Sequence, residues 1–464
     1  MLGFNSDKQG RVAIATFLLF AVSFFLGGAS RLHEFRLAIV ELASLPLLLL
    51  ALAAIPDVSR RREHRLALSL VTATAALPLV QLIPLPPAVW SALPGRQDLA
   101  LTFAITGLPE TWLPLSLTPD KTWRSFLALM PPIAMFLALM VSTAPQRSRL
   151  VQALLVCALL GMVLGANQFV SGGERFYPWA TTDAGNFTGF FANRNHMATL
   201  CLIGIPFAVV LAAGAIRRGG PKANQAVWFG ILYIASATVA VGVIQSRSGI
   251  ILFLPVLIAS LLAVWVASGR GRPRPAVLAL IGGVTVAVVG IAIFAAGRLL
   301  ARFDTGGAID PRFQNWPTVL EAAERYLPFG SGLGSFDAVY RSVEPLERLD
   351  ATFFNQAHNE YLETLLETGW LGVILIVLFM VWFTRRAWTA WCASISSQRD
   401  LQRAATIAIG TLLMHSAADY PLRTVTMATI FALCCGLLEL ATRTDEELAT
   451  ERSRSRSPRS RVRD

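Results

Sequence analysis

Runs of about 20 apolar residues, separated by short polar linkers, repeat along almost the whole chain. A helix of that length crosses the hydrocarbon core of a bilayer, so each run predicts a membrane-spanning helix. The first run also resembles a signal peptide, because small residues follow its apolar part, but the runs behind it favour an uncleaved span. The twelve predicted spans are 12–30, 37–55, 66–84, 123–142, 150–170, 197–216, 226–244, 249–267, 276–297, 361–383, 404–420 and 424–442.

The composition excludes a water-soluble fold of this size. The 464 residues are 54% hydrophobic and only 15% charged, whereas a soluble domain contains roughly 25% charged residues. The predicted fold class is therefore all-α, a polytopic membrane helical bundle of about twelve transmembrane helices with a large outer loop.

The net charge of +11 would suggest nucleic-acid binding in a soluble protein. Here the basic residues lie in linkers between apolar runs and in the last residues of the chain, RSRSRSPRSRVRD. We therefore expect no nucleic-acid partner, and we expect a disordered basic cytoplasmic tail over 443–464, close to the headgroups of membrane lipids.

Lysine and arginine collect in every second linker, which orients the chain. Because basic short loops stay in the cytoplasm, both termini are predicted to be cytoplasmic. Three long outer segments remain, at 85–122, 171–196 and 298–360. Within the third, Pro317–Leu327 predicts a helix with a proline in its first turn.

The five cysteines have no metal-ligand spacing, and four of them lie inside apolar runs. They are interpreted as small hydrophobic residues, without a disulfide framework. No acidic cluster with metal spacing occurs in the outer segments, so we predict no metal. The cysteines are Cys157, Cys201, Cys392, Cys434 and Cys435.

Arg247 is the first candidate functional residue. It lies in QSRSG, between two apolar runs that together cover 227–267, about twice the length that crosses a bilayer. The motif is therefore expected to be a tight hairpin at the outer membrane surface. An arginine there is either a functional group in a medium of low dielectric constant or a snorkelling residue that marks the end of a span.

His358 begins the second motif, HNEYLETLLETG. In a helix, Glu360, Glu363 and Glu367 would form one stripe, because they are spaced by three and four residues. A neutral imidazole at the start of this span could accept a proton from an attacking hydroxyl. The alternative is an interfacial histidine that hydrogen-bonds to a loop carbonyl.

The large outer loop contributes two further motifs. Arg312 lies in DPRFQNW, where Asp304 or Asp310 could pair with it. The stretch PFGSGLGSF at 328–336 has GxGxG spacing and follows no predicted strand, which excludes a Rossmann motif. Its glycines either form a plain turn, which is the favoured interpretation, or let backbone N–H groups approach a phosphate.

Polar residues also gather at the outer ends of two other spans. FTGFFANRNHMA at 187–198 contains Asn193, Arg194, Asn195 and His196, more hydrogen-bonding groups than helix capping requires. HSAADYPLR at 415–423 suggests a pair between its aspartate and its final arginine, Asp419 and Arg423.

Together these residues predict an outward-facing site with guanidinium groups and a histidine. Two arginines suit a diphosphate, because each offers planar bidentate donors to phosphate oxygens. The histidine suits deprotonation of an alcohol. The expected reaction is attack of an acceptor hydroxyl on a sugar carbon, with a lipid diphosphate as the leaving group.

These motifs, in this order, resemble the O-antigen ligase and O-antigen polymerase family of bacterial membrane glycan transferases. The resemblance covers roughly 150–440, and HNEYLE is its most telling part. It divides the chain into N-terminal transmembrane helices at 1–149, a ligase/polymerase-like core at 150–442 and the tail. It also implies a membrane glycosyltransferase bundle of the GT-C-like type, in the bacterial inner membrane, with a periplasmic loop that covers a periplasmic site.

The resemblance also assigns roles. Arg247 and Arg312 would bind the diphosphate of an undecaprenyl-diphosphate-linked glycan and stabilise the leaving group, and His358 would activate the acceptor, without metal or cofactor. Substrate-binding residues would come from the same motifs. Arg194 stands where relatives often carry a smaller residue, so no role is assigned to it. The substrate-binding candidates are Asn193, Asn195, Trp316 and Asn359.

The sequence leaves several functions open. An O-antigen ligase would transfer a glycan to lipid A-core. A polymerase would use a lipid-linked repeat as the acceptor, and a protein O-glycosyltransferase would use a protein. A lipid-linked sugar flippase is less well supported, because transporters place polar groups near the middle of the membrane and contain internal repeats.

Overall fold

Nearly all of the secondary structure described by the computed structural model is helical, which confirms the all-α prediction. Two two-residue strands, β1 (Pro84–Leu85) and β2 (Leu113–Pro114), pair antiparallel. The structure describes residues 6–29, 34–59, 62–172, 175–179, 183–267, 282, 311–348, 354–393 and 396–439.

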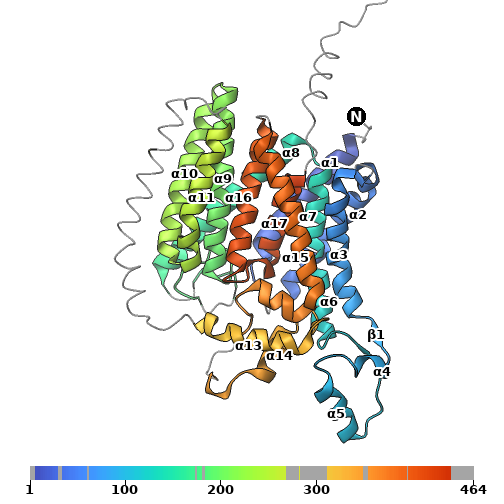
Figure 1. Cartoon of the computed structure of the whole chain (residues 1–464). Coiled ribbons are helices and arrows are strands. Elements are labelled where there is room, and N and C mark those ends of the chain that lie inside the picture. Colours follow the sequence, from blue (N-terminus) through green and yellow to red (C-terminus); the bar gives the residue numbers. More distant parts are fainter. Residues whose placement is uncertain are drawn as a thin grey trace, which may run out of the picture.

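The long helices run side by side from one end of the molecule to the other (Figure 1). They are α1 (Ser6–Leu26), α2 (Glu34–Ser59), α3 (Arg65–Gln81), α6 (Pro119–Ala128) continued by α7 (Met130–Val141), α8 (Ala144–Ser171), α9 (Arg194–Arg218), α10 (Lys222–Ile244), α11 (Arg247–Ala267), α15 (Glu360–Cys392), α16 (Ser397–Ser416) and α17 (Val425–Glu439). Shorter pieces are α4 (Pro87–Trp90), α5 (Gln97–Thr106), α13 (Pro311–Tyr326), α14 (Phe336–Val343) and the 3-10 turns η1 (Arg62–His64), η2 (Leu346–Arg348) and η3 (Pro421–Arg423).

Eight helices of the described residues are long and apolar enough to cross a bilayer. The helices α3 and α17 are apolar but shorter. Every predicted span except 276–297 overlaps a helix of the bundle. That segment, apart from residue 282, lies outside the described residues, as does the tail at 443–464. The chain is therefore a helical membrane protein.

Successive long helices alternate in direction, so their connections fall at two ends of the bundle (Figure 1). We call the end where α13 and α14 lie the loop end. The opposite end, where α9 ends and α10 begins, is called the basic end, because its linkers hold the basic residues that orient the predicted topology. This alternation agrees with the alternation of basic and non-basic linkers in the sequence.

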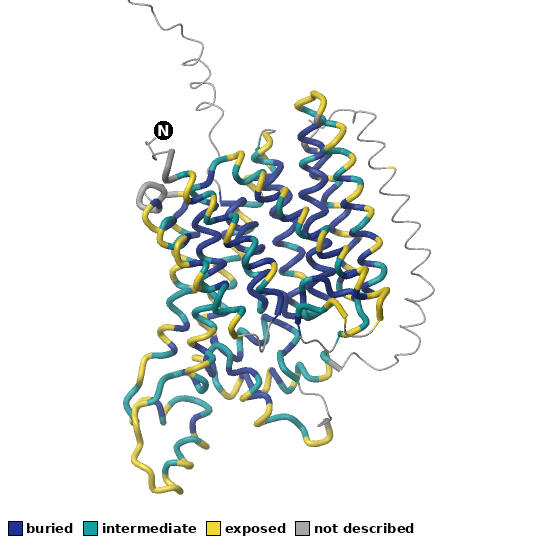
Figure 2. Tube along the Cα trace, turned by 180° about the vertical axis from the view of Figure 1, so that it is seen from behind, coloured by how far each residue is buried: buried dark blue, intermediate teal, exposed yellow. Residues whose placement is uncertain are grey.

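Helix α9 is at the centre of the bundle. Within its most apolar window, 83% of the residues are buried, and it packs against α8, α10, α11 and α16. The reason is in its sequence, which is apolar on all sides, and such a helix is stable only when it is enclosed. Figure 2 shows the buried centre of the bundle and a more exposed layer around it. Residues at the first turn of α9 are consequently held firmly at the loop end.

A second, smaller core attaches the outer loop to the bundle. Val319 and Ala323 of α13 pack with Phe336 and Tyr340 of α14 and with Leu366 of α15, all of them buried. Helix α13 begins at Pro311, six residues before the predicted start, so the prediction of its first turn was wrong. The earlier start places Arg312 in the first turn of α13, where the loop meets the bundle.

Candidate active site

A buried aspartate, Asp419, lies at the centre of the polar residues of the loop end. It follows the end of α16, and its side chain is fully buried. Its Oδ1 accepts a hydrogen bond from the backbone N–H of Tyr420 at 2.9 Å and lies 3.3 Å from Nδ1 of His358. An ionised carboxylate can only accept hydrogen bonds, so Nδ1 of His358 carries the proton that faces Asp419, and in the neutral ring Nε2 is the nitrogen with the lone pair.

The second oxygen of Asp419 joins residues from three other segments. The side-chain amide of Asn195 donates to Oδ2 at 2.6 Å. Nη1 of Arg312 lies 3.6 Å from the same oxygen, and Nε2 of His415 lies 3.9 Å from it. One carboxylate thus gathers groups from α9, α13, α16 and the loop before α15. We call Asp419, His358, Arg312, Asn195 and His415 the Asp419 cluster.

The electrostatics of the cluster keep Asp419 ionised. Burial by itself would raise the pKa of this carboxyl group, because a low-dielectric surrounding disfavours charge. The hydrogen bond from His358 and the nearby imidazoles of His415 and His196 outweigh burial, and they hold the pKa of Asp419 below its usual range. The aspartate therefore remains an acceptor for His358 at neutral pH.

His358 is held in an uncommon backbone conformation. Its φ is 48°, in the left-handed region that residues other than glycine seldom adopt. Such conformations persist where surrounding contacts enforce them, and they concentrate at functional sites. Here the ring lies 4.8 Å from the ring of Tyr420 and 5.6 Å from that of Phe354, measured between centroids. The side chain is 12% exposed, so it lies at the edge of the cluster.

Asn359 and Trp316, two of the predicted substrate-binding residues, make contacts that hold the segment around His358 in place. The side-chain oxygen of Asn359 caps α15 by accepting from the N–H groups of Tyr361 and Leu362 at 3.1 and 3.2 Å. The indole N–H of Trp316 donates to the carbonyl of Ala357 at 3.1 Å, which ties α13 to the segment that carries His358. Both residues therefore help to position the start of α15 and the segment that carries His358.

Arg312 connects the cluster to the outside of the bundle. Its side chain is 36% exposed, although its partner Asp419 is fully buried. The predicted partners Asp304 and Asp310 lie outside the described residues. One side of Arg312 therefore contacts the buried carboxylate of Asp419, and the rest is accessible from the loop end. An anionic group could bind to it from that end.

The first turn of α9 holds Asn193 and Asn195 in place. Asn193 is the N-cap of α9, and its side-chain oxygen accepts from the N–H of Asn195 at 2.8 Å. Asn193 and Asn355 also hydrogen-bond to the side chain of Tyr420, which lowers the pKa of its hydroxyl. Burial outweighs these bonds and raises the pKa of Tyr420 to about 12. Arg194 turns away, toward Asn186 and Asp183. The side chains of the two asparagines thus lie beside Tyr420 and Asp419, whereas the side chain of Arg194 contacts the loop before α9.

Arg247 lies on the neighbouring helix start. Helix α10 ends at Ile244 and α11 begins at Arg247, so the predicted tight hairpin is confirmed, with Gln245 in the left-handed region at φ 53°. Two residues on, a β-carbon built on Gly249 would lie 2.9 Å from Cβ of Ala198 in α9. Arg247 is exposed. It therefore lies at the loop end beside the first turns of α9, outside the Asp419 cluster as defined above.

Two histidines of this region, His196 and His415, were not assigned a role from the sequence. His196 is buried, and its ring lies 5.4 Å from that of Tyr420. Within the described segments, neither of its ring nitrogens has a hydrogen-bond partner. Nδ1 of His415 hydrogen-bonds with the hydroxyl of Thr199. A signal for His415 exists in the sequence, because it precedes Asp419 by four residues, one helical turn.

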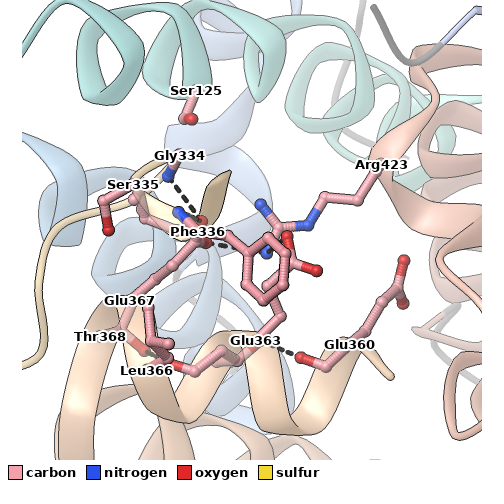
Figure 3. Close-up of polar contacts among 12 residues, drawn as sticks. Ser125, Gly334, Ser335, Phe336, Glu360, Glu363, Leu366, Glu367, Thr368 and Arg423 are labelled. Carbon is pink, nitrogen blue, oxygen red and sulfur yellow. Dashed lines mark hydrogen bonds and ion pairs between the residues drawn. The ribbon is translucent and has the colours of Figure 1, made fainter. Parts of the chain in front are cut away.

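The glutamate stripe of α15 forms a second polar group, which Figure 3 shows. Glu363 and Glu367 are fully buried, and Nη2 of Arg423 lies 3.2 Å and 2.8 Å from their carboxylates. Glu360 accepts from the hydroxyl of Ser416 and from the N–H of Leu422. The predicted stripe is therefore confirmed.

The predicted pair of Asp419 with Arg423 is wrong. Helix α16 ends at Ser416, and the 3-10 turn η3 redirects the chain, so the two residues are not one helical turn apart. As a result Asp419 points toward α9 and α13, whereas Arg423 points toward α15. The polar residues of this motif serve two separate clusters.

The glycine-rich stretch at 328–336 is a turn, as the favoured interpretation expected. Gly330, Gly332 and Gly334 all have positive φ. The N–H of Gly334 donates to a carboxylate oxygen of Glu367 at 2.9 Å (Figure 3), and the N–H of Leu333 donates to the side chain of Gln81 at 3.0 Å. These N–H groups already have partners within the protein, which argues against a phosphate cradle here.

In the part of the chain that the structure describes, no group of three His, Cys, Asp or Glu residues could hold a metal ion. All five cysteines are free.

Comparison with known proteins gives one family match. Residues 232–377 match the family model described as O-Antigen ligase, Wzy_C. The matched region contains Arg247, Arg312, Trp316, His358 and Asn359, and it ends before Asp419. No curated protein matches the sequence.

Proposed function

With an O-antigen ligase domain at residues 232–377 as the premise, we propose that this protein transfers a glycan from an undecaprenyl diphosphate carrier to an acceptor hydroxyl at the loop end of the bundle. The observation that carries the proposal is the Asp419 cluster, in which a histidine with a fixed tautomer lies beside a partly exposed arginine. The proposed bundle type is that of GT-C-like membrane glycosyltransferases, with about twelve spans, both termini in the cytoplasm and the loop end in the periplasm of the inner membrane.

In this mechanism His358 is the general base. Asp419 orients the ring through Nδ1 and leaves Nε2 to accept the proton of the acceptor hydroxyl. The acceptor oxygen attacks the anomeric carbon, the bond from that carbon to the phosphate oxygen breaks, and the lipid diphosphate leaves with the electron pair. Asp419 stabilises the imidazolium that forms, because the positive charge appears next to its carboxylate.

The arginines supply the electrostatic part of the reaction. Arg312 can offer planar bidentate donors to phosphate oxygens from the partly exposed edge of the cluster. Arg247, on the adjacent start of α11, is exposed at the same end and would contact the same diphosphate. The negative charge on the diphosphate increases as the bond to the anomeric carbon breaks, and two guanidinium groups would stabilise that charge. The proposed transfer therefore needs no metal.

Asn193, Asn195, Asn359 and Trp316 would shape the substrate-binding part of this site. Their contacts hold the first turn of α9, the start of α15 and α13 around His358 and Asp419. The preferred acceptor is lipid A-core, as in an O-antigen ligase. A polymerase that extends a lipid-linked repeat, or an enzyme that glycosylates a protein, would use the same chemistry on another hydroxyl.

The test uses a deletion strain complemented with single variants. Arg247→Ala, Arg312→Ala and His358→Ala are expected to abolish glycan transfer while protein levels stay normal, whereas Arg325→Ala on α13 serves as a matched control. Arg325 is 53% exposed and pairs with Glu321 one turn away. Full activity in all three site variants would overturn the mechanism.

Gel analysis of the glycans in the deletion strain separates the acceptors. Long chains that remain unattached to lipid A-core indicate a ligase, and single attached repeats indicate a polymerase. Transfer by the purified protein, with donor and acceptor supplied on one side of the membrane, would exclude an obligatory flippase role.

A further inference from the structure

A cavity at the basic end has no part in the proposed transfer. It has a volume of about 70 Å³ and is partly open to solvent, between the start of α8, the end of α9 and the start of α16. The Asp419 cluster lies at the loop end, at the other end of α9 and α16. A cavity of this size holds a few water molecules or one phosphate-sized group, and its opening lets a longer molecule continue outside it.

Two arginines form the polar side of this cavity. Nε and Nη2 of Arg147 donate to the carbonyl of Ser142 at 3.0 and 2.6 Å, which fixes the direction of its guanidinium group. Nη1 of Arg218 donates to the hydroxyl of Ser397 at 3.2 Å. Among the residues that the structure describes, neither arginine forms an ion pair with a carboxylate.

The acidic residue in the cavity wall does not neutralise these arginines, because it is already paired. Asp400 forms ion pairs with Arg217 and with Arg403, whose Nη1 lies 3.0 Å from Oδ1. Asp400 is buried between the two guanidinium groups. The charge that remains available at the cavity is therefore positive, which favours an anionic ligand.

The other side of the cavity is apolar. Val210 and Leu211 of α9 and Leu401 of α16 line it, next to the two arginines. A cationic rim beside an apolar wall, at the end of a membrane-spanning bundle, matches a molecule that has a phosphate group joined to a hydrocarbon chain. Free phosphate would use the arginines but would gain nothing from the apolar wall.

We propose that this cavity binds an anionic phospholipid, with its headgroup phosphate between Arg147 and Arg218 and an acyl chain against Leu211 and Leu401. The distribution of basic linkers assigns this end to the cytoplasm, so the lipid would belong to the cytoplasmic leaflet. The hydroxyls of Ser148 and Ser397 lie in the same wall and can donate to the phosphate oxygens. The site is independent of the proposed glycan transfer.

The experiment titrates the purified full-length protein in neutral detergent with short-chain phosphatidylglycerol and follows binding by native mass spectrometry. Phosphatidylcholine and inorganic phosphate are the comparison ligands. We expect Arg218→Gln to weaken phosphatidylglycerol binding about tenfold or more, the loss expected for a charge-assisted hydrogen bond. Arg147→Gln is expected to have a similar effect.

Arg149→Gln is the matched control. Arg149 lies two residues from Arg147 on α8 and is exposed, but it does not line the cavity. Its variant should bind phosphatidylglycerol like the wild type. If Arg147→Gln fails to fold because its contact with Ser142 is lost, Arg218→Gln decides the outcome, since Arg218 is exposed and its loss leaves the bundle intact.

Three results would overturn the proposal. Equal weakening by Arg149→Gln and Arg218→Gln would indicate non-specific attraction to a basic surface. Equal binding of phosphatidylcholine and phosphatidylglycerol would exclude recognition of an anionic headgroup. Binding of inorganic phosphate as tightly as phosphatidylglycerol would indicate a site for a free anion instead of a lipid.

Discussion

His358 and Asp419 are 61 residues apart in the sequence, yet Nδ1 of the histidine lies 3.3 Å from Oδ1 of the aspartate. One residue precedes α15 and the other follows α16, two helices that pack against each other. The contact fixes which ring nitrogen of His358 carries the proton. The proposed role of this histidine as a base therefore depends on a carboxylate outside its own motif.

Asp419→Asn should lower the turnover number about 100-fold or more while the Michaelis constant for the donor changes little. An amide can donate as well as accept, so His358 is free to adopt the other tautomer, and general-base catalysis contributes about 100-fold to 10,000-fold. The measurement is the rate of transfer by the purified variant.

A double-variant cycle separates positioning from a structural effect. If Asp419 acts through His358, combining Asp419→Asn with His358→Ala should cost little more than His358→Ala alone. Additive losses would contradict the positioning role. Asp183→Asn is the control, because Asp183 is also at the loop end but accepts from the N–H of Arg194 instead.

Replacing Arg312 with lysine should preserve charge but not function. Lysine lacks the planar fork that binds two phosphate oxygens, so transfer should fall at least about tenfold, and Arg312→Ala should lower it further. Donor binding, measured with a non-transferable lipid diphosphate, should weaken in parallel. Unchanged donor binding in Arg312→Ala would contradict contact between this arginine and the diphosphate.

Arg423→Ala should destabilise the fold. It would leave the buried carboxylates of Glu363 and Glu367 without their cation, and removing one partner of a buried ion pair typically costs about 3–5 kcal/mol. The thermal unfolding midpoint in detergent should fall clearly. Arg341→Ala is the control: Arg341 is 58% exposed and pairs with Asp337 at 3.8 Å, so its loss should cost less than about 1 kcal/mol. Equal midpoints for the two variants would contradict this account of Arg423.

Gly330→Ala should also destabilise the protein, because there is no room for a side chain. A β-carbon on Gly330 would lie 2.6 Å from backbone atoms of Glu367, Thr368 and Gly369, and its φ is +81°. Gly107 has a similar φ, +66°, but a β-carbon there would have no atom within 4 Å. Gly107→Ala therefore isolates the cost of the left-handed conformation, about 1 kcal/mol. A similar loss in both variants would show that the close approach of the turn to α15 does not matter.

The sequence predicted the helices well, because the length of an apolar run can be read directly from the sequence. The glutamate stripe of α15 and the hairpin before Arg247 followed from helical spacing and from the length of the apolar runs. The predictions of where helices begin and end were less accurate. The early start of α13 at Pro311 and the end of α16 at Ser416 are examples, and the second led to the wrong partner for Arg423.

The assembly of the Asp419 cluster was beyond the sequence, because it depends on contacts between distant segments. Asn195 and Asp419 are 224 residues apart, and only the packing of α9 against α16 brings them together. A lone aspartate in HSAADYPLR gives no sign of being an acceptor for His358. The candidate residues could be named from their motifs, whereas the residue that joins them could not.

The most direct test is the initial rate at which the purified protein, reconstituted in liposomes, transfers a glycan from undecaprenyl diphosphate to an acceptor hydroxyl. We predict that His358→Ala reduces this rate about 100-fold or more and still binds the donor with near wild-type affinity, while the control Arg325→Ala transfers normally. A wild-type rate for His358→Ala would contradict the account, because no imidazole would then be needed to take the proton of the acceptor.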